Sequence, residues 1–310
     1  MGADRFVIVN DVGPRDGLQN QPVQVPTAGK LKLIRRLLAA GLKHIEVTSF
    51  VSPKAVPQMA DAAEVYAGLP PAADVEYSAL IPNEKGYERA RAAGARSVAV
   101  VLSATETMNR KNISMSLEQA RAVSHAVVAR ARADAVTSRA YIAVAFECPY
   151  EGPVDAERVR LLAAELFERG ADEVIIADTI GAANPQAVAR LFERLGREFG
   201  TERLSAHFHD TRALALANAW AALQAGIRKF DASIGGLGGC PFAPGASGNV
   251  ATEDLVLLLH QCGYATGIDV DKLCDAVAVA SELIGAPLGG RMLPWRRAAQ
   301  ARAAAKGARA

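Results

Sequence analysis

The chain has 310 residues, 50% of them hydrophobic, which is enough to bury a sizeable core in one large domain or two small ones. Its 35 Lys and Arg residues against 33 Asp and Glu residues leave a formal net charge of +2, and this near balance argues against nucleic-acid or polybasic membrane-surface binding. No apolar run approaches the roughly 20 residues of a transmembrane helix, so we expect no membrane partner either.

The four cysteines lie far apart and form no CxxC pair, which argues against a zinc ribbon or a disulfide framework. The first strand-like run, Phe6–Val9, follows no charged and then apolar leader, so we expect no signal peptide. These features predict a cytoplasmic enzyme with reduced thiols. Cys262 and Cys274 are interpreted as packed residues of the C-terminal helices, with a redox role as the alternative.

Short β-branched runs alternate with longer Ala-, Leu- and Arg-rich stretches of helical spacing. The predicted strands are Phe6–Val12, His44–Ser49, Val75–Ile81, Ser97–Leu102, Arg139–Phe146, Glu173–Asp178, Leu204–His209 and Lys229–Ile234. The predicted helices include Thr27–Ala40, Leu117–Ala133, Asp155–Arg169, Asn184–Phe199 and Thr211–Ala225.

Helix-capping signals agree with these ranges. Asn184 before Pro185 is typical of an N-cap, and Ser116 precedes a helix with Glu118 in its first turn. Four glycines predict helix ends shortly before the next strand: Gly41, Gly94, Gly170 and Gly226.

Eight strand–helix units of roughly 30 residues favour a parallel sheet with right-handed crossovers, closed into a (β/α)8 TIM barrel with a C-terminal helical extension. An open, doubly wound sheet is the competing architecture. We predict a single catalytic domain over residues 1–290, including the C-terminal helices, and a frayed Arg/Ala-rich tail over 291–310.

The segment Gly13–Gln19 (GPRDGLQ) follows the first strand directly. It places Arg15 and Asp16 side by side at the carboxyl end of that strand, where TIM barrels build their active sites. The alternative is a simple turn in which Asp16 caps the backbone.

His207 and His209 are two residues apart on the seventh strand, so their side chains point to the same face. Two imidazoles with one carboxylate, such as Asp16, are a common ligand set for Mg²⁺, Mn²⁺, Co²⁺ or Zn²⁺. The alternative is that these histidines are core residues whose hydrogen bonds are made within the protein.

The glycine-rich loop Ser233–Pro241 (SIGGLGGCP) follows the eighth strand and carries Cys240. A cysteine on such a loop is a candidate acid or nucleophile, while a phosphate-cradling loop with an incidental thiol is the alternative. No Walker A or strict GxGxxG pattern is present.

Three more polar residues stand at or near predicted strand ends: Glu46, Asp178 and Asn249. Each one alone is more typical of a cap or a supporting residue than of a catalyst. Their common position at one end of the barrel makes them candidates for the same site.

At these residues the chain resembles the 3-hydroxy-3-methylglutaryl-CoA lyases, which are metal-dependent lyases of the DRE-TIM group. The resemblance extends from about residue 6 to residue 290. The matching motifs are VGPRDGLQN (Val12–Asn20), TSFVSPKAVPQM (Thr48–Met59), CPYEG (Cys148–Gly152), DTIG (Asp178–Gly181), HFHDT (His207–Thr211) and GGLGGCPFAPGASGNVATEDL (Gly235–Leu255).

The resemblance implies an acyl-CoA substrate, cleavage to acetyl-CoA and acetoacetate at the end of leucine breakdown, and a homodimer. It implies four ligands for Mg²⁺ or Mn²⁺: Asp16, His207, His209 and Asn249. It also implies that Arg15 stabilises the thioester enolate and, with Gln19, contacts the substrate. Cys240 then protonates the product, and Glu46 and Asp178 lie near the metal.

The chain departs from the family pattern at Asn10 and Asp11, and also at Gln21, Glu147 and Arg212, three positions that are expected to reshape the acyl pocket or its loop. They favour as an alternative a lyase for another branched 3-hydroxyacyl-CoA. Further alternatives are an aldol-type condensing synthase, a biotin-dependent carboxyltransferase with a carbamylated lysine, and a non-catalytic scaffold.

Overall fold

The computed structural model describes residues 5–239 and 248–307, in which eight parallel strands close into a barrel. The barrel strands are β1 (Ile8–Asp11), β2 (His44–Ser49), β3 (Glu76–Leu80), β4 (Ser97–Ser103), β5 (Thr137–Ala143), β8 (Glu173–Asp178), β9 (Leu204–Phe208) and β10 (Lys229–Ala232). Strand β1 pairs in parallel with both β10 and β2, so the sheet has no open edge. The TIM-barrel prediction is therefore confirmed, and the open-sheet alternative is wrong.

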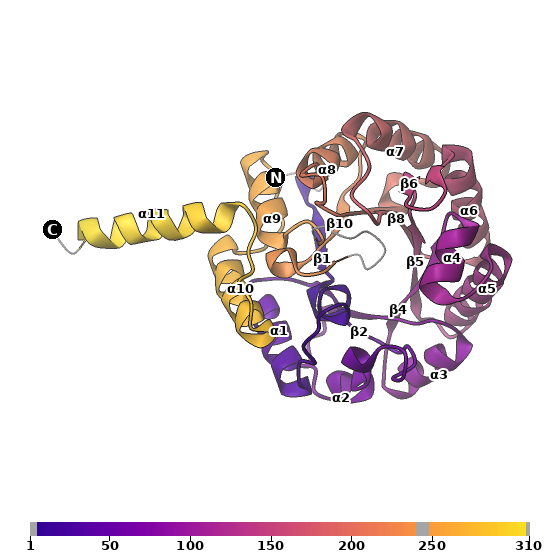
Figure 1. The fold of residues 1–310 in the computed structure, drawn as a ribbon, viewed down its shortest axis with the longest axis horizontal. Helices are drawn as coiled ribbons and strands as arrows, with labels where there is room; N and C mark the ends of the chain where they lie inside the picture. The colour runs from indigo at the N-terminus through magenta and orange to yellow at the C-terminus, as the bar shows by residue number, and fades with distance from the viewer. Residues whose placement is uncertain (1–4, 240–247, 308–310) are drawn as a thin grey trace.

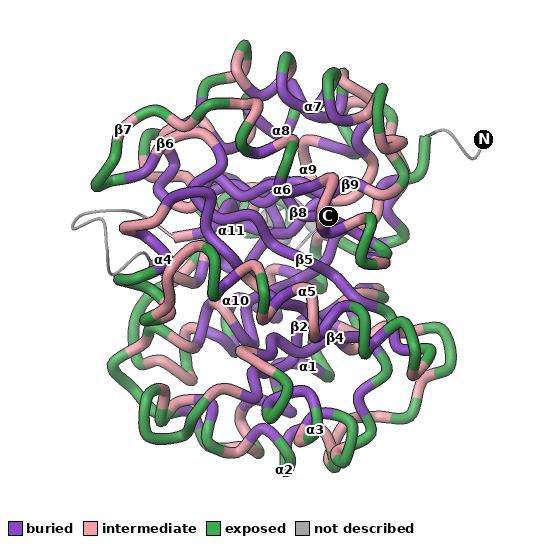
Figure 2. Tube along the Cα trace, turned by 90° about the vertical axis from the view of Figure 1, so that its right-hand side faces the viewer, coloured by how far each residue is buried: buried purple, intermediate pink, exposed green. Residues whose placement is uncertain are grey.

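A ring of helices surrounds the strands (Figure 1). The helices are α1 (Thr27–Ala39), α2 (Ala62–Ala67), α3 (Glu84–Ala92), α4 (Glu106–Ile113), α5 (Leu117–Ala133), α6 (Ala156–Arg169), α7 (Pro185–Phe199), α8 (Ala215–Gln224), α9 (Thr252–Gln261), α10 (Val270–Ile284) and α11 (Met292–Gly307). Burial follows this arrangement, since the central strands are mostly buried and exposed residues gather on the outer helices and loops (Figure 2). None of the helices in the described ranges combines the length and apolar content that a membrane span requires.

Local sequence signals explain most helix boundaries. Ser116 accepts from the Gln119 backbone N–H while the Gln119 side chain accepts from the Ser116 N–H, which forms a capping box at the start of α5. Asn184 accepts from the backbone N–H of Ala187 and caps α7. The four predicted closing glycines have φ angles of 99°, 90°, 104° and 95°, which side chains rarely tolerate: Gly41, Gly94, Gly170 and Gly226.

Two predicted boundaries are wrong by several residues. Helix α8 begins at Ala215 instead of Thr211, because Ala213 has a φ of 56° and the Asp210 carboxylate accepts from the Ala215 N–H. Strand β5 ends at Ala143, since Val144 has a φ of 50° and leaves the sheet. After it, β6 (Glu147–Cys148) and β7 (Gly152–Pro153) form a small antiparallel hairpin that the sequence analysis did not predict.

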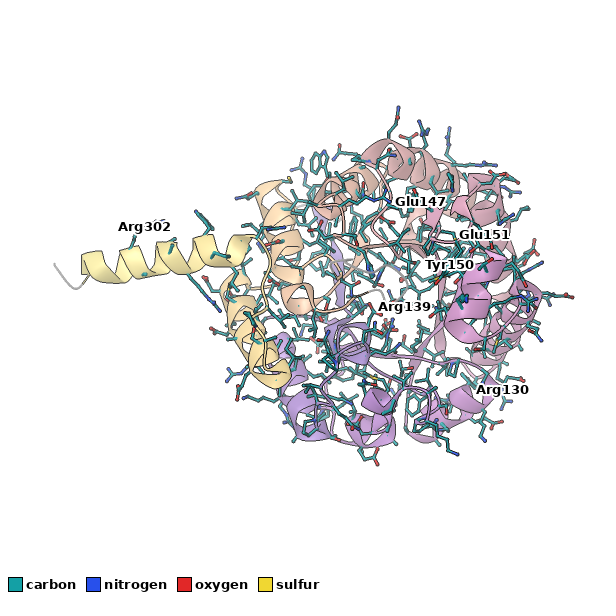
Figure 3. All side chains as sticks on the ribbon, in the orientation of Figure 1. Arg130, Arg139, Glu147, Tyr150, Glu151 and Arg302 are labelled. Atoms are coloured by element: carbon teal, nitrogen blue, oxygen red, sulfur yellow. The ribbon has the colours of Figure 1, made fainter. Side chains whose placement is uncertain are left out.

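The end of the chain also differs from the frayed tail expected after residue 290. Helix α11 projects away from the barrel, with Arg302 exposed on its projecting part (Figures 1 and 3). Its base is anchored, because Met292 and Leu293 are buried and the Met292 N–H donates to the Asp254 carboxylate. Polyalanine-like sequence supports the remaining helix.

The barrel interior is polar at both ends and apolar between them. Leu80, Ala99, Tyr141 and Ile175 form the apolar layer, and Val101 packs against it. The carboxyl-end residues above this layer form the candidate site, whereas the amino-end residues below it pair with one another.

Candidate active site at the carboxyl end of the barrel

A cavity of about 430 Å³ opens at the carboxyl end of the barrel. Its polar floor includes Arg15, Asp16, His207 and His209. Its apolar wall comes from the loops and strands on the opposite side and includes Val56, Leu80, Ile81, Val101, Met108, Ile113 and Met115. Convergent polar groups at the bottom of a largely apolar cavity are typical of an enzyme site for an amphipathic substrate.

Arg15 and Asp16 reach this floor from η2 (Gly13–Gly17), one turn of π-helix that follows β1. The turn is fixed from below, where the buried Asp11 carboxylate accepts from the Gly13 N–H at 2.9 Å and from the Thr252 hydroxyl at 2.7 Å. Burial raises the pKa of Asp11 to about 7. Single π-helical turns recur at functional sites because they redirect side chains within one turn.

The Arg15 guanidinium is held by two carboxylates. Its Nε and Nη2 lie 2.7 and 2.6 Å from Oε2 of Glu46, and its Nη1 lies 2.9 Å from Oδ1 of Asp16. Burial lowers the pKa of Arg15, but Glu46 and Asp16 outweigh that effect and raise it. Burial raises the pKa of Glu46, against the opposing effect of Arg15. Arg15 is therefore a fixed cation on the cavity floor.

Asp16, His207 and His209 each offer one ligand atom, and these atoms lie within 4.8 Å of one another. Burial raises the pKa of Asp16, but Arg15 and the two imidazoles outweigh it and hold the pKa below its usual range. Burial, together with the neighbouring His207, lowers the pKa of His209 to about 4. A carboxylate and a neutral imidazole are the protonation states that bind a metal.

Asn249 joins this group through the chain segment that follows the glycine-rich loop. Its backbone forms a bridge with His209, and its Nδ2 donates to Oδ2 of Asp16 at 2.8 Å. Gly238 makes room for it, because a Cβ there would lie 2.7 Å from the Asn249 side-chain nitrogen.

Several buried polar atoms at this point have no partner among the described residues, including Nδ1 of His209 and Oδ1 of Asn249. Buried polar atoms normally have partners, and unpaired ones indicate a missing ion or ligand. Two imidazoles, one carboxylate and one amide oxygen fit a divalent cation such as Mg²⁺ or Mn²⁺.

Three predicted site residues remain: Gln19, Asp178 and Cys240. Gln19 lines the cavity, and its Oε1 is buried without a partner. Asp178 ends β8, but its two oxygens accept from the N–H groups of Ala182 and Ala183 at 2.8 and 3.0 Å, so it braces a loop. Burial raises its pKa to about 6. Cys240 lies outside the described residues.

The departures at Gln21, Glu147 and Arg212 do not line the described part of the cavity. Glu147, the first residue of β6, pairs with Arg212 at 3.3 Å on the rim, and Figure 3 labels Glu147. Gln21 donates to the Gly17 carbonyl at 3.2 Å and so braces η2. The expectation that Glu147 and Arg212 shape the acyl pocket finds no support in this placement.

Four residues beneath His207 were not predicted as site residues from the sequence: Asp231, and Asn10, Arg139 and Tyr141, which each donate to its carboxylate. A signal was available for Asp231, because aspartate is rare in strands and residue 231 shares a strand face with residues 229 and 233. Its partners come from other strands, which a single strand's pattern does not identify.

The comparisons with known proteins agree with this geometry. Residues 6–280 match the family described as HMGL-like. The chain is 46% identical to a hydroxymethylglutaryl-CoA lyase of Bacillus subtilis over 93% of this chain and 96% of the relative. It is 45% identical to a 3-hydroxy-3-isohexenylglutaryl-CoA/hydroxymethylglutaryl-CoA lyase of Pseudomonas aeruginosa over 94% and 97%. A solved HMG-CoA lyase of Acinetobacter baumannii, in complex with coenzyme A and 3-methylmalate, superimposes with a TM-score of 0.90 at 40% identity, covering 94% and 95% of the two chains.

Proposed function

The chain belongs to the HMGL-like family and is a carbon–carbon lyase, and on that premise we propose that it cleaves 3-hydroxy-3-methylglutaryl-CoA to acetyl-CoA and acetoacetate. The single observation that carries the proposal is the pairing of a fixed cation, Arg15, with the ligand group of Asp16, His207 and His209 on one cavity floor. We place the reaction at the end of leucine breakdown.

The metal ligands in this proposal are Asp16, His207, His209 and Asn249, with Mg²⁺ or Mn²⁺ as the ion. When bound, the cation lowers the pKa of the substrate's tertiary hydroxyl and polarises the oxygen that becomes the acetoacetate carbonyl. Glu46 and Asp178 are the candidate acceptors for the hydroxyl proton, and burial raises the pKa of both carboxyl groups. Glu46 has an oxygen without a partner among the described residues, whereas both oxygens of Asp178 accept from backbone N–H groups.

The bond between C2 and C3 breaks with its electron pair moving to C2, which leaves the enolate of acetyl-CoA. Arg15 stabilises that negative charge, because Glu46 and Asp16 hold the guanidinium in place before the reaction begins. Gln19 offers a second polar contact to the substrate from the same loop. Cys240 then delivers a proton to the new methyl carbon.

Acetoacetate release from 3-hydroxy-3-methylglutaryl-CoA tests the proposal directly. We expect release that stops after EDTA treatment and returns with Mg²⁺ or Mn²⁺. Absence of release from a protein that still binds the metal would contradict the substrate and leave the metal site standing. The Cys240→Ser variant separates a lyase from a condensing synthase: the lyase loses turnover by orders of magnitude while it keeps its metal.

A lyase for a longer branched 3-hydroxyacyl-CoA is the second candidate. The Pseudomonas aeruginosa relative with the isohexenyl substrate in its name and the apolar cavity wall that includes Met108, Ile113 and Met115 favour it. Comparing kcat/KM for the methyl and the isohexenyl substrates decides between them. The described cavity lining contains no lysine, which disfavours a carboxyltransferase that needs a carbamylated one.

We also propose one catalytic domain over residues 1–290, a homodimer and a cytoplasmic location. The three described cysteines, Cys148, Cys262 and Cys274, are free, as reduced thiols would be. Light scattering on the purified protein tests the dimer, where a monomer mass would contradict it. Cell fractionation tests the location.

A further inference from the structure

Asp231, in the middle of β10, is a buried carboxylate that the proposed reaction leaves without a role. It is 2% exposed and lies directly beside the seventh barrel strand, where its Cα pairs in register with that of His207. Its Oδ2 lies 3.2 Å from Nδ1 of His207, on the side of the imidazole that faces down into the barrel. This contact ties a candidate metal ligand to the layer beneath it.

The other described groups that hydrogen-bond this carboxylate are all donors. Oδ2 accepts from the Tyr141 hydroxyl at 2.7 Å, and Oδ1 accepts from Nδ2 of Asn10 at 2.7 Å and from Nη2 of Arg139 at 3.2 Å. A buried carboxylate beside a guanidinium and two neutral donors remains ionised and has no proton to give. The contact with His207 is therefore made by the imidazole N–H, so Nδ1 carries the proton.

The location of that proton determines what His207 offers to the cavity. A neutral imidazole with its proton on Nδ1 has its lone pair on Nε2, the nitrogen that points away from Asp231. His209 differs, because its Nδ1 is buried without a partner and nothing in the described chain fixes its tautomer from that side.

We propose that Asp231 is a positioning residue that fixes the tautomer and ring orientation of His207, so that His207 binds the divalent cation through Nε2. The inference rests on the metal site of the proposed function and assigns unequal roles to the two histidines. Asp231 orients the His207 ring and keeps a proton on Nδ1 before the ion arrives, whereas His209 acquires its tautomer when the ion binds.

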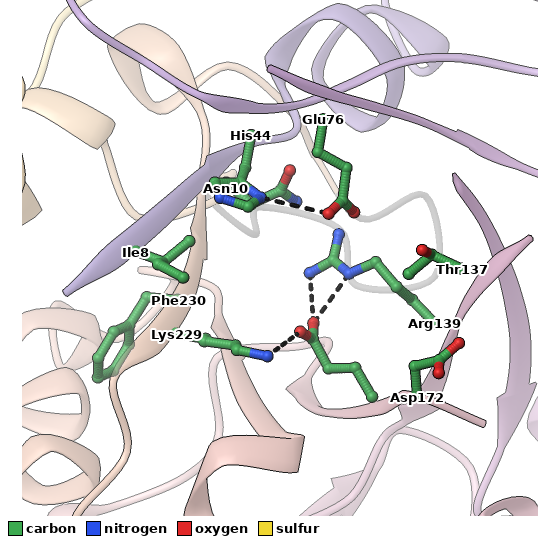
Figure 4. A pocket seen from close by; sticks show the side chains of 10 residues that line it. Ile8, Asn10, His44, Glu76, Thr137, Arg139, Asp172, Lys229 and Phe230 are labelled. Carbon is green, nitrogen blue, oxygen red and sulfur yellow. Dashed lines mark hydrogen bonds and ion pairs between the residues drawn. The ribbon is translucent and has the colours of Figure 1, made fainter. Parts of the chain in front are cut away.

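Asp231 is itself held from the amino end of the barrel. Arg139, which binds it, is also bound by Glu173 at 2.7 Å, and Glu173 accepts from Lys229 at 2.9 Å. Figure 4 shows this chain of ion pairs around Arg139 and Lys229, with Asn10 nearby. Arg139, Glu173 and Lys229 come from three different strands, β5, β8 and β10. Their ion pairs therefore limit the movement of the Asp231 carboxylate.

The Asp231→Asn variant tests the proposal because it keeps the shape and changes the donor pattern. The amide oxygen stays toward Arg139 and Asn10, since turning the NH₂ there would bury donors against donors. The NH₂ then faces both His207 and the Tyr141 hydroxyl, whose oxygen can accept one of its hydrogens. The other hydrogen is donated to Nδ1 of His207 and forces the imidazole proton onto Nε2, where it blocks the cation. We expect Mn²⁺ affinity of the EDTA-stripped protein, measured by calorimetry, to fall about 10- to 100-fold.

Asn10→Ala is the matched control, because it removes a bond to the same carboxylate from the oxygen that does not face His207. We expect Asn10→Ala to bind Mn²⁺ within about threefold of the parent protein, since the His207 tautomer is kept. Equal losses of affinity in both variants would mean that Asp231 only supports the fold, and would overturn the proposal.

A second measurement needs no variant. Histidine-labelled protein contains five imidazoles, and ¹⁵N spectroscopy of the metal-free form reports which nitrogen of each carries the proton. His207, assigned from a His207→Gln spectrum, is expected to carry it on Nδ1, and to carry it on Nε2 in Asp231→Asn. A proton on Nε2 without one on Nδ1 in the parent protein would overturn the proposal even if Asp231→Asn failed to fold.

The outcomes also separate this inference from the proposed function. If the parent protein binds no Mn²⁺, the metal site of the proposed function fails and this inference fails with it. If the parent protein binds Mn²⁺ and Asp231→Asn binds it equally well, only the role of Asp231 fails.

Discussion

The two ends of the barrel interior are both polar, but they differ in how many of their described polar groups are paired. At the amino end, Arg139, Glu173 and Lys229 pair at 2.7 to 2.9 Å, and His44 lies 3.6 Å from Glu76 (Figure 4). At the carboxyl end, Nδ1 of His209, Oδ1 of Asn249 and Oε1 of Glu46 are buried and have no partner in residues 5–239 and 248–307.

This difference indicates which end serves stability and which serves chemistry. Unpaired buried polar atoms cost stability, so they persist where a ligand completes them. At the opposite end each buried charge of Arg139 and Glu173 lies beside an opposite one, and removal of one partner of such a pair is costly. In TIM barrels, the carboxyl end is also the one built from loops that vary freely.

The largest effect, a loss of turnover, is expected at the carboxyl end of the barrel. His209→Ala should lower turnover about 10³-fold, since a bound cation contributes several kcal/mol of charge stabilisation and about 1.4 kcal/mol corresponds to a tenfold rate. The free energy of unfolding of the metal-free protein should change little, because Nδ1 of His209 loses no bond. Steady-state kinetics and urea unfolding measure the two quantities.

His44→Ala is the matched control at the opposite end, and it should keep turnover within about twofold because His44 does not line the cavity. If His44→Ala lost activity as His209→Ala does, the division between the two ends would be wrong.

A substitution in the ion pairs at the amino end should lower the free energy of unfolding instead. Arg139→Met leaves the buried carboxylates of Glu173 and Asp231 without their shared cation, and removal of one partner of a buried pair costs about 3–5 kcal/mol. Urea unfolding of the metal-free protein checks this value. A loss below about 1 kcal/mol would mean that water or another cation satisfies these groups.

A smaller loss is expected at the edge of the same network. Lys229→Met removes a half-buried ammonium, but Glu173 keeps its bonds to Arg139, so we expect a loss of about 1 kcal/mol in unfolding free energy. Turnover should be unchanged. A loss as large as that of Arg139→Met would show that Lys229 and Arg139 form one cooperative unit.

The smallest effect is expected at the rim. Glu147 and Arg212 form an exposed pair at 3.3 Å, and a double-mutant cycle with alanine at both positions should give a coupling energy of about 0.2–1 kcal/mol. Because neither residue lines the described cavity, KM for the acyl-CoA should stay constant. A clear change in KM would restore these positions as determinants of the acyl pocket.

Much of the architecture was predictable because it depends on local signals. Alternating β-branched runs and closing glycines gave strands β2 and β8 with their observed bounds, and the spacing of His207 and His209 predicted their shared face. The shifted start of α8 was not predictable, because the cap comes from Asp210 and a positive φ at Ala213.

The amino-acid sequence by itself determined the alternation of strands and helices, the turn that carries Arg15 and Asp16, and the histidine pair, because each depends on residues a few positions apart. Tertiary structure alone decided that Asn249 meets Asp16 and that Asp231 meets His207, Tyr141 and Arg139. The physical reason is barrel closure. Closure aligns strands that are up to 221 residues apart, as in the bond from Asn10 to Asp231, and hydrogen bonds across that register depend on packing that no local pattern encodes.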